Sequence, residues 1–282
     1  MDLKTLNKAD VPAGQHTPLD FAVTSRDSRV VDMVREAISE NRVRLAFQPV
    51  VMSRDHMSLI YYEGFVRVID KTGRVIPARD FIHEVEVTEV GRRIDCVALK
   101  QGLKTLSANP SLRLAINLSA RSIGYQDWNT ILKQGIQSDP SVASRLILEI
   151  TESSVIHVPE LVVSFMTRLQ KKGIHFALDD FGSGFTSFRF LKQFYFDILK
   201  IDGQFIRNIA HDSGNQIIAH TMSTLAAQFD MLCIAENVET AADAEYLGLI
   251  GVEGLQGYLF GAPTVQPPWT VKTPKPRKRK LF

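Results

Sequence analysis

Residues 176–184 read Phe-Ala-Leu-Asp-Asp-Phe-Gly-Ser-Gly, an apolar run that ends in two adjacent carboxylates and a glycine-rich segment. A buried strand gains nothing structural from two acids at its tip, because their mutual repulsion costs free energy unless cations or hydrogen bonds offset it. Paired acids at the carboxyl end of a parallel strand are well placed to hold a divalent metal ion. An aspartate before Phe-Gly-Ser can also cap a helix. The residues at the ends of the other predicted strands distinguish between these two interpretations, a metal site and a helix cap.

Apolar, β-branched runs recur on both sides of this stretch. The eight predicted strands cover 44–51, 58–69, 112–118, 145–151, 174–179, 196–202, 231–236 and 252–260. Helical patterns separate most of them, and the clearest cover 28–41, 159–172, 214–229 and 240–250. Alternating strands and helices favour a parallel sheet, and eight strands over about 240 residues fit a closed (β/α)8 barrel. The alternative is an open doubly wound sheet, against which no Gly-x-Gly-x-x-Gly follows the first strand.

The first two predicted strands do not fit a regular barrel. Only a short polar link around Ser53-Arg54-Asp55-His56 separates them. No crossover helix fits in such a link, so we expect the two strands to pair as an antiparallel hairpin. The predicted fold is therefore an α/β barrel that is irregular at its start.

Composition limits the class of protein. The chain has 282 residues, of which 45% are hydrophobic and 23% charged, values typical of a globular protein. It contains no apolar run of the roughly 18 residues that a membrane span needs, and Met1-Asp2-Leu3-Lys4 does not begin a signal peptide. Two cysteines, Cys96 and Cys233, make neither a disulfide framework nor a cysteine metal site. We therefore expect a cytoplasmic protein.

The basic residues gather at the carboxyl end. Six of the 33 lysines and arginines lie in 272–282, where no acid occurs, so the rest of the chain is mildly acidic. Such a tail could bind an unknown partner, although we do not expect nucleic acid to be that partner. A disordered, solubilising end is the alternative.

Almost every predicted strand ends in a polar or ionisable side chain. In barrels of this type the active site lies at the carboxyl ends of the strands. Each residue alone has a simple explanation, such as a cap, a turn or a surface ion pair, but repeated burial of charge at one barrel mouth requires a neutralising ligand. The oxygen donors are Glu63, Asn117, Glu149, Asp179 and Asp180. Such donors suit Mg²⁺ or Mn²⁺ better than zinc, and more than one carboxylate pair suggests two metals. Lys200 and Glu236 would then orient or deprotonate a water molecule.

At this point the motifs resemble a known family, the EAL domain, which is the cyclic di-GMP phosphodiesterase module of bacterial signalling. The matches run in order over about residues 42–263. They are Phe47-Gln48-Pro49-Val50-Val51, Glu63, Arg67, Asn117-Leu118-Ser119-Ala120-Arg121, Leu148-Glu149-Ile150-Thr151-Glu152-Ser153, Ala177–Gly184, Leu199-Lys200-Ile201-Asp202, Ala235-Glu236-Asn237-Val238-Glu239-Thr240 and Gln256-Gly257-Tyr258-Leu259-Phe260.

The resemblance implies a modified TIM-like barrel with an antiparallel first strand, and hydrolysis of cyclic di-GMP to linear pGpG with two Mg²⁺ or Mn²⁺ ions. It implies that Glu63, Asn117, Glu149 and Asp179 bind one metal, and that Asp179 and Asp180 bind the other. Lys200 would hold the attacking water, with Glu236 as a candidate base. Arg67 would contact phosphate, and Gln48 and Gln256 the nucleotide. Glu152 would anchor the loop 181–188, which in the family links homodimerisation to catalysis, and Asp202 and Glu239 would lie behind the ligands.

The predicted organisation is a flexible extension over 1–25, an EAL domain over 26–264 and a proline-rich basic tail over 265–282.

Two departures from the family pattern stand out. The naming motif reads Glu63-Gly64-Phe65 instead of Glu-Ala-Leu, and we expect Phe65 to need extra room in the packing. Asn237 replaces a glycine, and we expect it to adopt the positive φ of that turn. A non-catalytic cyclic di-GMP receptor and an interaction module that uses the tail are the alternatives to an active enzyme.

Overall fold

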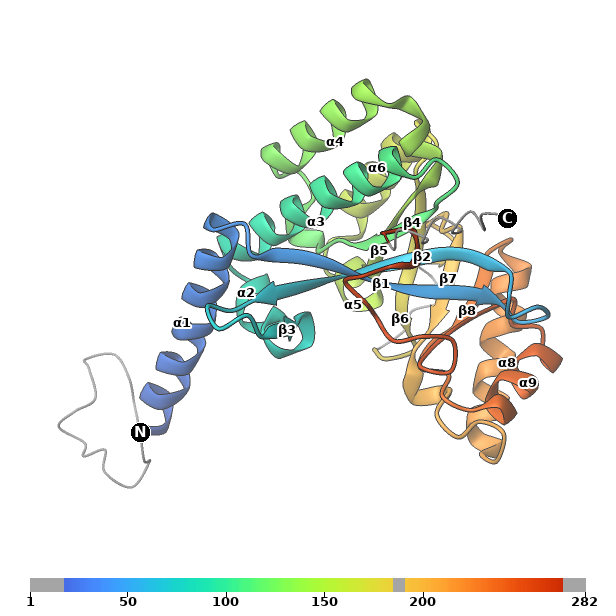
Figure 1. The fold of residues 1–282 in the computed structure, drawn as a ribbon. Coiled ribbons are helices and arrows are strands. Elements are labelled where there is room, and N and C mark those ends of the chain that lie inside the picture. Colours follow the sequence, from blue (N-terminus) through green and yellow to red (C-terminus); the bar gives the residue numbers. More distant parts are fainter. Residues whose placement is uncertain (1–17, 185–190, 271–282) are drawn as a thin grey trace, which may run out of the picture.

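A closed barrel forms the body of the protein (Figure 1), seen in a computed structural model that describes residues 18–184 and 191–270. Its eight strands are β1 (Val43–Met52), β2 (Leu59–Ile69), β4 (Leu114–Asn117), β5 (Leu146–Thr151), β6 (His175–Phe181), β7 (Ile198–Ile201), β8 (Leu232–Ala235) and β9 (Gly254–Gln256). The order around the sheet is β1-β9-β8-β7-β6-β5-β4-β2, and pairing of β1 with β2 closes it. The predicted barrel is confirmed, and the open sheet is wrong.

The antiparallel hairpin at the start is also confirmed. β1 runs antiparallel to both of its neighbours, β2 and β9, whereas the pairings from β2 through β4 to β9 are parallel. The hairpin register places Gln48 opposite Glu63. One short strand was not predicted: β3 (Val75–Pro77) adds to the outer edge of β2, and three residues are too few to show an alternating pattern.

Helices surround the barrel (Figure 1). The longer ones are α1 (Pro18–Ser39), α3 (Glu89–Ala108), α4 (Gln126–Ser138), α6 (Pro159–Gln170), α8 (Ser213–Gln228) and α9 (Ala241–Leu249), and the short α2 (Ile82–Glu86) and α5 (Glu152–His157) lie between strands and longer helices. The predicted helices at 159–172, 214–229 and 240–250 are confirmed, and Thr240 caps α9 as expected. The sequence did not single out α3 or α4.

The amino-terminal helix begins earlier than predicted. α1 starts at Pro18, so residues 18–25 are helical, although the sequence assigned them to a flexible extension. Proline is favoured in the first turn of a helix because its missing N–H would have no intrahelical partner there. The rest of that extension, and the basic part of the predicted tail, fall outside the described residues. No helix in the described ranges is both long and apolar enough to cross a bilayer.

Two layers of side chains fill the barrel interior. The lower layer consists of Val50, Tyr61, Ala115, Ile147, Ala177, Ile198 and Ile234. Since side chains two residues apart on a strand share a face, the next layer toward the mouth contains Gln48, Glu63, Asn117, Glu149, Asp179, Lys200, Glu236 and Gln256. The barrel geometry thus brings the predicted site residues together on top of an apolar floor.

Candidate metal centre

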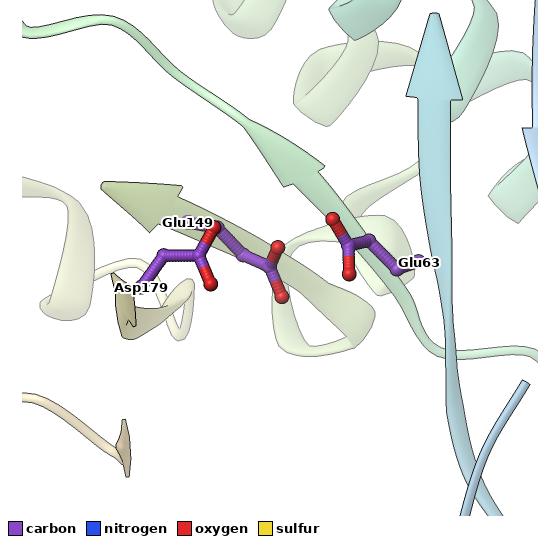
Figure 2. A group of neighbouring side chains, drawn as sticks. All are labelled: Glu63, Glu149 and Asp179. Carbon is purple, nitrogen blue, oxygen red and sulfur yellow. The ribbon is translucent and has the colours of Figure 1, made fainter. Parts of the chain in front are cut away.

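The carboxylates form two groups that share one residue. Ligand oxygens of Glu63, Glu149 and Asp179 lie within 4.8 Å of one another, and so do those of Asp179, Asp180 and Glu236. Figure 2 shows the first group, with the carboxylates of three different strands following one another across the barrel. Strand register produces this arrangement, because Asn117 lies beside Glu149, and Thr151 beside Asp179. Asp179 is therefore the one carboxylate common to both groups.

Lys200 lies at the centre of these acids. Its ammonium group is fully buried, and Nζ lies 2.9 Å from Glu63 Oε2, 3.1 Å from Glu149 Oε2, 2.9 Å from Asp179 Oδ1 and 2.6 Å from Glu236 Oε1. Burial opposes the charge on Lys200, but the four carboxylates, led by Asp179, outweigh it and raise the pKa of this group well above its usual range. Lys200 is therefore buried among the acids and does not extend to the surface, while its role in a site stays a prediction.

A single ammonium group does not neutralise the acidic cluster. Burial, followed by repulsion from Glu63, raises the pKa of Glu149 well above its usual range, and burial does the same for the pKa of Glu236. Burial and the charge of Asp179 raise the pKa of Asp180 to about 6. Glu149 Oε1 is buried and has no hydrogen-bond partner among the described residues. Excess negative charge and a free acceptor oxygen fit a site for hard divalent cations such as Mg²⁺ or Mn²⁺.

Amide side chains hold Glu63 in place. Asn117 Nδ2 donates to Glu63 Oε1 over 2.8 Å, and Gln256 Nε2 donates to Glu63 Oε2 over 2.9 Å. Gln48 Nε2 donates in turn to the Gly261 carbonyl over 2.9 Å. Both glutamines are buried, and Gln48 Oε1 accepts from Gln256 Nε2 over 3.3 Å, so Gln48 is joined to Glu63 only through Gln256. Nucleotide contact by either residue stays a prediction.

The end of β6 is bent by one irregular residue. Asp180 has φ +55°, and the pairing with β7 shifts register between Leu178 and Phe181. Such a bulge breaks the alternation of the strand, so that Asp179 and its neighbour Asp180 both line the same cavity. This geometry favours the metal interpretation of the acidic pair over the helix cap.

A cavity of about 490 Å³ extends from the acids to a basic rim. Arg67 and Arg79 line its outer part, and the Arg67 guanidinium lies 5.7 Å from the centre of the Phe65 ring. The expectation that Phe65 needs room in the core is wrong, because it shares the inner face of β2 with Glu63 and lines the cavity. Arg79 was not predicted, since its place at the cavity follows from the short strand β3, which pairs with β2 just before it in the chain.

The remaining predicted residues lie behind or beside the acids. Glu152 Oε2 accepts a 2.9 Å hydrogen bond from the Gly182 amide, which ties down the start of the loop predicted at 181–188. Residues 185–188 of that loop fall outside the described residues. Asp202 caps the short helix η6 (Gly203–Phe205) by accepting from Gln204 N over 2.7 Å, and Glu239 lines the cavity rim.

Asn237 keeps the turn after β8, as predicted. Its φ is +54°, within the left-handed region that asparagine tolerates. Its side chain covers Gly203, where an added Cβ would lie only 2.0 Å from Asn237 Nδ2. The loss of a glycine at 237 is thus accommodated by the presence of one at 203.

The fold agrees with the comparisons with known proteins. The sequence model of the EAL domain matches residues 31–263, and the chain belongs to the EAL domain family. It is 30% identical over 82% of its length to "Cyclic di-GMP phosphodiesterase PdeR" and 30% identical over 83% to "Cyclic di-GMP phosphodiesterase PdeF", both of Escherichia coli K12. Among solved structures it resembles the PaMucR phosphodiesterase in its cyclic di-GMP complex, with TM-score 0.73, 27% identity and coverage of 84% of this chain and 97% of that one.

The two Escherichia coli relatives are much longer than the matched region. The alignment covers 35% of PdeR and 32% of PdeF, so this chain spans about a third of their length. Their names describe whole proteins, and the activity of the present chain has to be argued from its own residues.

Proposed function

We propose that this chain hydrolyses cyclic di-GMP to linear pGpG with two divalent cations, Mg²⁺ or Mn²⁺. The observation that carries the proposal is the pair of carboxylate groups that share Asp179 and surround Lys200. Glu63, Asn117, Glu149 and Asp179 would hold one cation, and Asp179 with Asp180 the other. When bound, such a pair of cations polarises a phosphodiester and lowers the pKa of a water molecule. The named relatives support the choice of substrate.

The protein side chains would divide the remaining work. Lys200 would orient the attacking water, and Glu236 would accept a proton from that water. Glu236 Oε1 lies 2.6 Å from Lys200 Nζ. Arg67, at the rim of the cavity, would bind a phosphate that lies away from the acids. Gln48 and Gln256 would fix the substrate through the same hydrogen-bond network that holds Glu63.

A direct test is to incubate the protein with cyclic di-GMP and either Mg²⁺ or Mn²⁺ and to separate the products by chromatography. The proposal expects pGpG with at least one metal and none after chelation. Glu63→Ala should reduce the rate by orders of magnitude, since it removes a metal ligand. Absence of pGpG from folded protein with both metals would contradict the proposal.

The receptor alternative makes the opposite prediction, which is tight binding of cyclic di-GMP without turnover. The two departures from the family pattern that motivate this alternative, Gly64 and Asn237, do not disturb the backbone conformation beside the site. A Cβ at Gly64 would have only ordinary contacts of 3.5 Å, and Asn237 adopts the conformation that the turn requires. The complete acidic set therefore supports catalysis over binding alone.

We also propose homodimerisation, which the family resemblance suggests, with the segment after β6 as its link to the site. The Glu152–Gly182 hydrogen bond is the contact that supports this link. Light scattering coupled to size exclusion tests the dimer, and a monomer at all concentrations would contradict it.

A further inference from the structure

The chain that follows the last barrel strand returns across the outside of the β1–β2 hairpin (Figure 1). Phe47 N donates to the Thr264 carbonyl over 2.8 Å, and Thr264 N donates to the Phe47 carbonyl over 3.1 Å. The short helix η7 (Pro268–Thr270) then places Trp269 against the same hairpin. We call residues 264–270 the strap, and it comes directly after the region that the family model matches.

The strap supports the part of β1 that β9 does not reach. β9 pairs with β1 only from Val50 to Met52, so β2 is the one strand in the described ranges that pairs with β1 around Gln48. An unpaired strand edge exposes main-chain groups and is free to shift. The two hydrogen bonds with Thr264 cover this edge one residue from Gln48, and the Gln48 side chain donates to the carbonyl of Gly261, just before the strap, over 2.9 Å.

Trp269 packs on the outer face of the hairpin, behind the residues that enter the site. Its ring centroid lies 5.1 Å from that of Phe47 and 4.7 Å from that of Tyr62, in both cases edge-on. Each of these two residues immediately precedes one member of the facing pair Gln48 and Glu63. Since neighbouring residues on a strand point to opposite faces, one indole ring spans from outside the pair whose side chains point inward.

Hydrogen bonds carry the position of this pair to the acids. Gln256 Nε2 donates to Gln48 Oε1 over 3.3 Å and to Glu63 Oε2 over 2.9 Å. Lys200 Nζ lies 2.9 Å from the same Glu63 oxygen. A shift of the hairpin would therefore move a proposed metal ligand together with the side chains that orient it.

We propose that Trp269 is a positioning residue, through which the strap holds Glu63 in the orientation that binds a cation. The inference rests on the metal site of the proposed function. Partners behind a metal ligand orient that ligand in many metal sites, and here the partner is an aromatic side chain on the far face of the strand. A strap that only stabilised the fold would change the unfolding temperature and leave metal affinity unchanged.

The test compares wild type, Trp269→Ala and Trp269→Phe, each stripped of metal and titrated with Mn²⁺ in a calorimeter. Loss of a partner behind a metal ligand weakens metal affinity 10–100-fold, so Trp269→Ala should raise the Mn²⁺ dissociation constant about tenfold. Trp269→Phe keeps an aromatic ring between Phe47 and Tyr62 and should recover most of the affinity. Val162→Ala is the control for general loss of stability, because it removes a buried apolar contact from α6, and its Mn²⁺ affinity should match wild type.

Hydrogen exchange in chelator tests the strap without metal. Because the Phe47 amide donates to Thr264, Trp269→Ala should speed exchange in peptides covering 44–50 more than Val162→Ala does. Unchanged exchange there, or equal Mn²⁺ affinity of wild type and folded Trp269→Ala, would overturn the inference, and so would an equal loss of affinity in Val162→Ala. If the wild-type chain itself binds no Mn²⁺, the proposed metal site fails and the positioning role fails with it, even where exchange shows that Trp269 holds the hairpin.

Discussion

At the scale of single residues, Lys200 dominates the electrostatics of the site. A fully buried ammonium group is tolerated here because four carboxylates surround it. Removing one member of a buried ionic network leaves the others uncompensated. We therefore expect Lys200 to contribute to stability as well as to the proposed catalysis.

Lys200→Met should reduce the free energy of unfolding in chelator by about 3–5 kcal/mol, because it leaves the acids without their cation. Added Mn²⁺ should restore part of that loss, since a cation can replace the missing positive charge. Denaturant unfolding with and without metal measures both effects. Lys104→Met, at an exposed position of α3, is the control. Equal stability of the two variants in chelator would contradict this account of Lys200.

The substitution of Gly64 by alanine gives a second prediction, which concerns the stability of the fold. Its φ lies outside the left-handed region, and a Cβ there meets no atom closer than 3.5 Å. Gly64→Ala should therefore stabilise the fold by about 0.4–1 kcal/mol through the unfolded chain and retain activity. Gly182→Ala is the contrasting variant, since φ is +96° and its Cβ would lie 2.5 Å from Met222 Cε. A destabilised Gly64→Ala protein in thermal unfolding would show that the strand cannot accept the family's alanine.

Asp95 gives the fold a pH dependence. Burial raises its pKa from 3.8 to about 7, although Ser122 Oγ and the Ser119 amide donate to it. The folded state then binds this proton more tightly than the unfolded state, so the contribution of Asp95 to stability falls as the pH rises from about 4 to 7. One group contributes a slope of at most about 1.4 kcal/mol per pH unit. Unfolding curves at several pH values should be flatter in this range for Asp95→Asn, and parallel curves would contradict the assignment.

At the scale of elements, the strand pattern made most of the site predictable. Side chains on a barrel strand alternate between inside and outside, so the acids at the strand ends had to meet once the strands closed. The positive φ of Asn237 was also predictable from residue type. Phe65 follows Glu63 by two residues on the same strand, so its side chain lies on the same face and lines the cavity. The sequence contained this signal, but the expectation that Phe65 packs in the core did not use it.

Other elements could not be derived in this way. β3 has only three residues, and without it nothing in the sequence places Arg79 at the cavity. The bulge at Asp180 depends on pairing with β7 and leaves no mark in residue type. These features come from contacts between distant segments, which local patterns do not encode.

The segment after β6 carries the prediction that belongs to this scale. Glu152→Ala removes the acceptor for the Gly182 amide, which lies 2.9 Å away. We expect faster amide exchange at residues 181–184 and lower phosphodiesterase activity, whereas Mn²⁺ affinity should change little because Glu152 is not a ligand. Hydrogen exchange with mass spectrometry measures the first effect. Unchanged exchange at Gly182 would mean that Glu152 does not anchor this segment.

At the scale of the whole molecule, closure of the barrel brings the residues of the candidate metal centre together. The two strands that close the barrel, β1 and β2, contribute Gln48 and Glu63, while the other acids and Lys200 come from β5 to β8 and the residues that follow them. No short segment holds the ligands alone. Metal binding and barrel integrity are therefore expected to depend on each other.

The proposed function depends most on Asp179, which would contribute to the binding of both cations. The most direct measurement is an anomalous-difference map from crystals soaked with Mn²⁺. We expect two peaks about 3.5–4 Å apart. Both peaks should lie within bonding distance of Asp179, one near Glu63 and Glu149 and the other near Asp180. No peak at the barrel mouth, or a single peak that Asp179 does not contact, would contradict it.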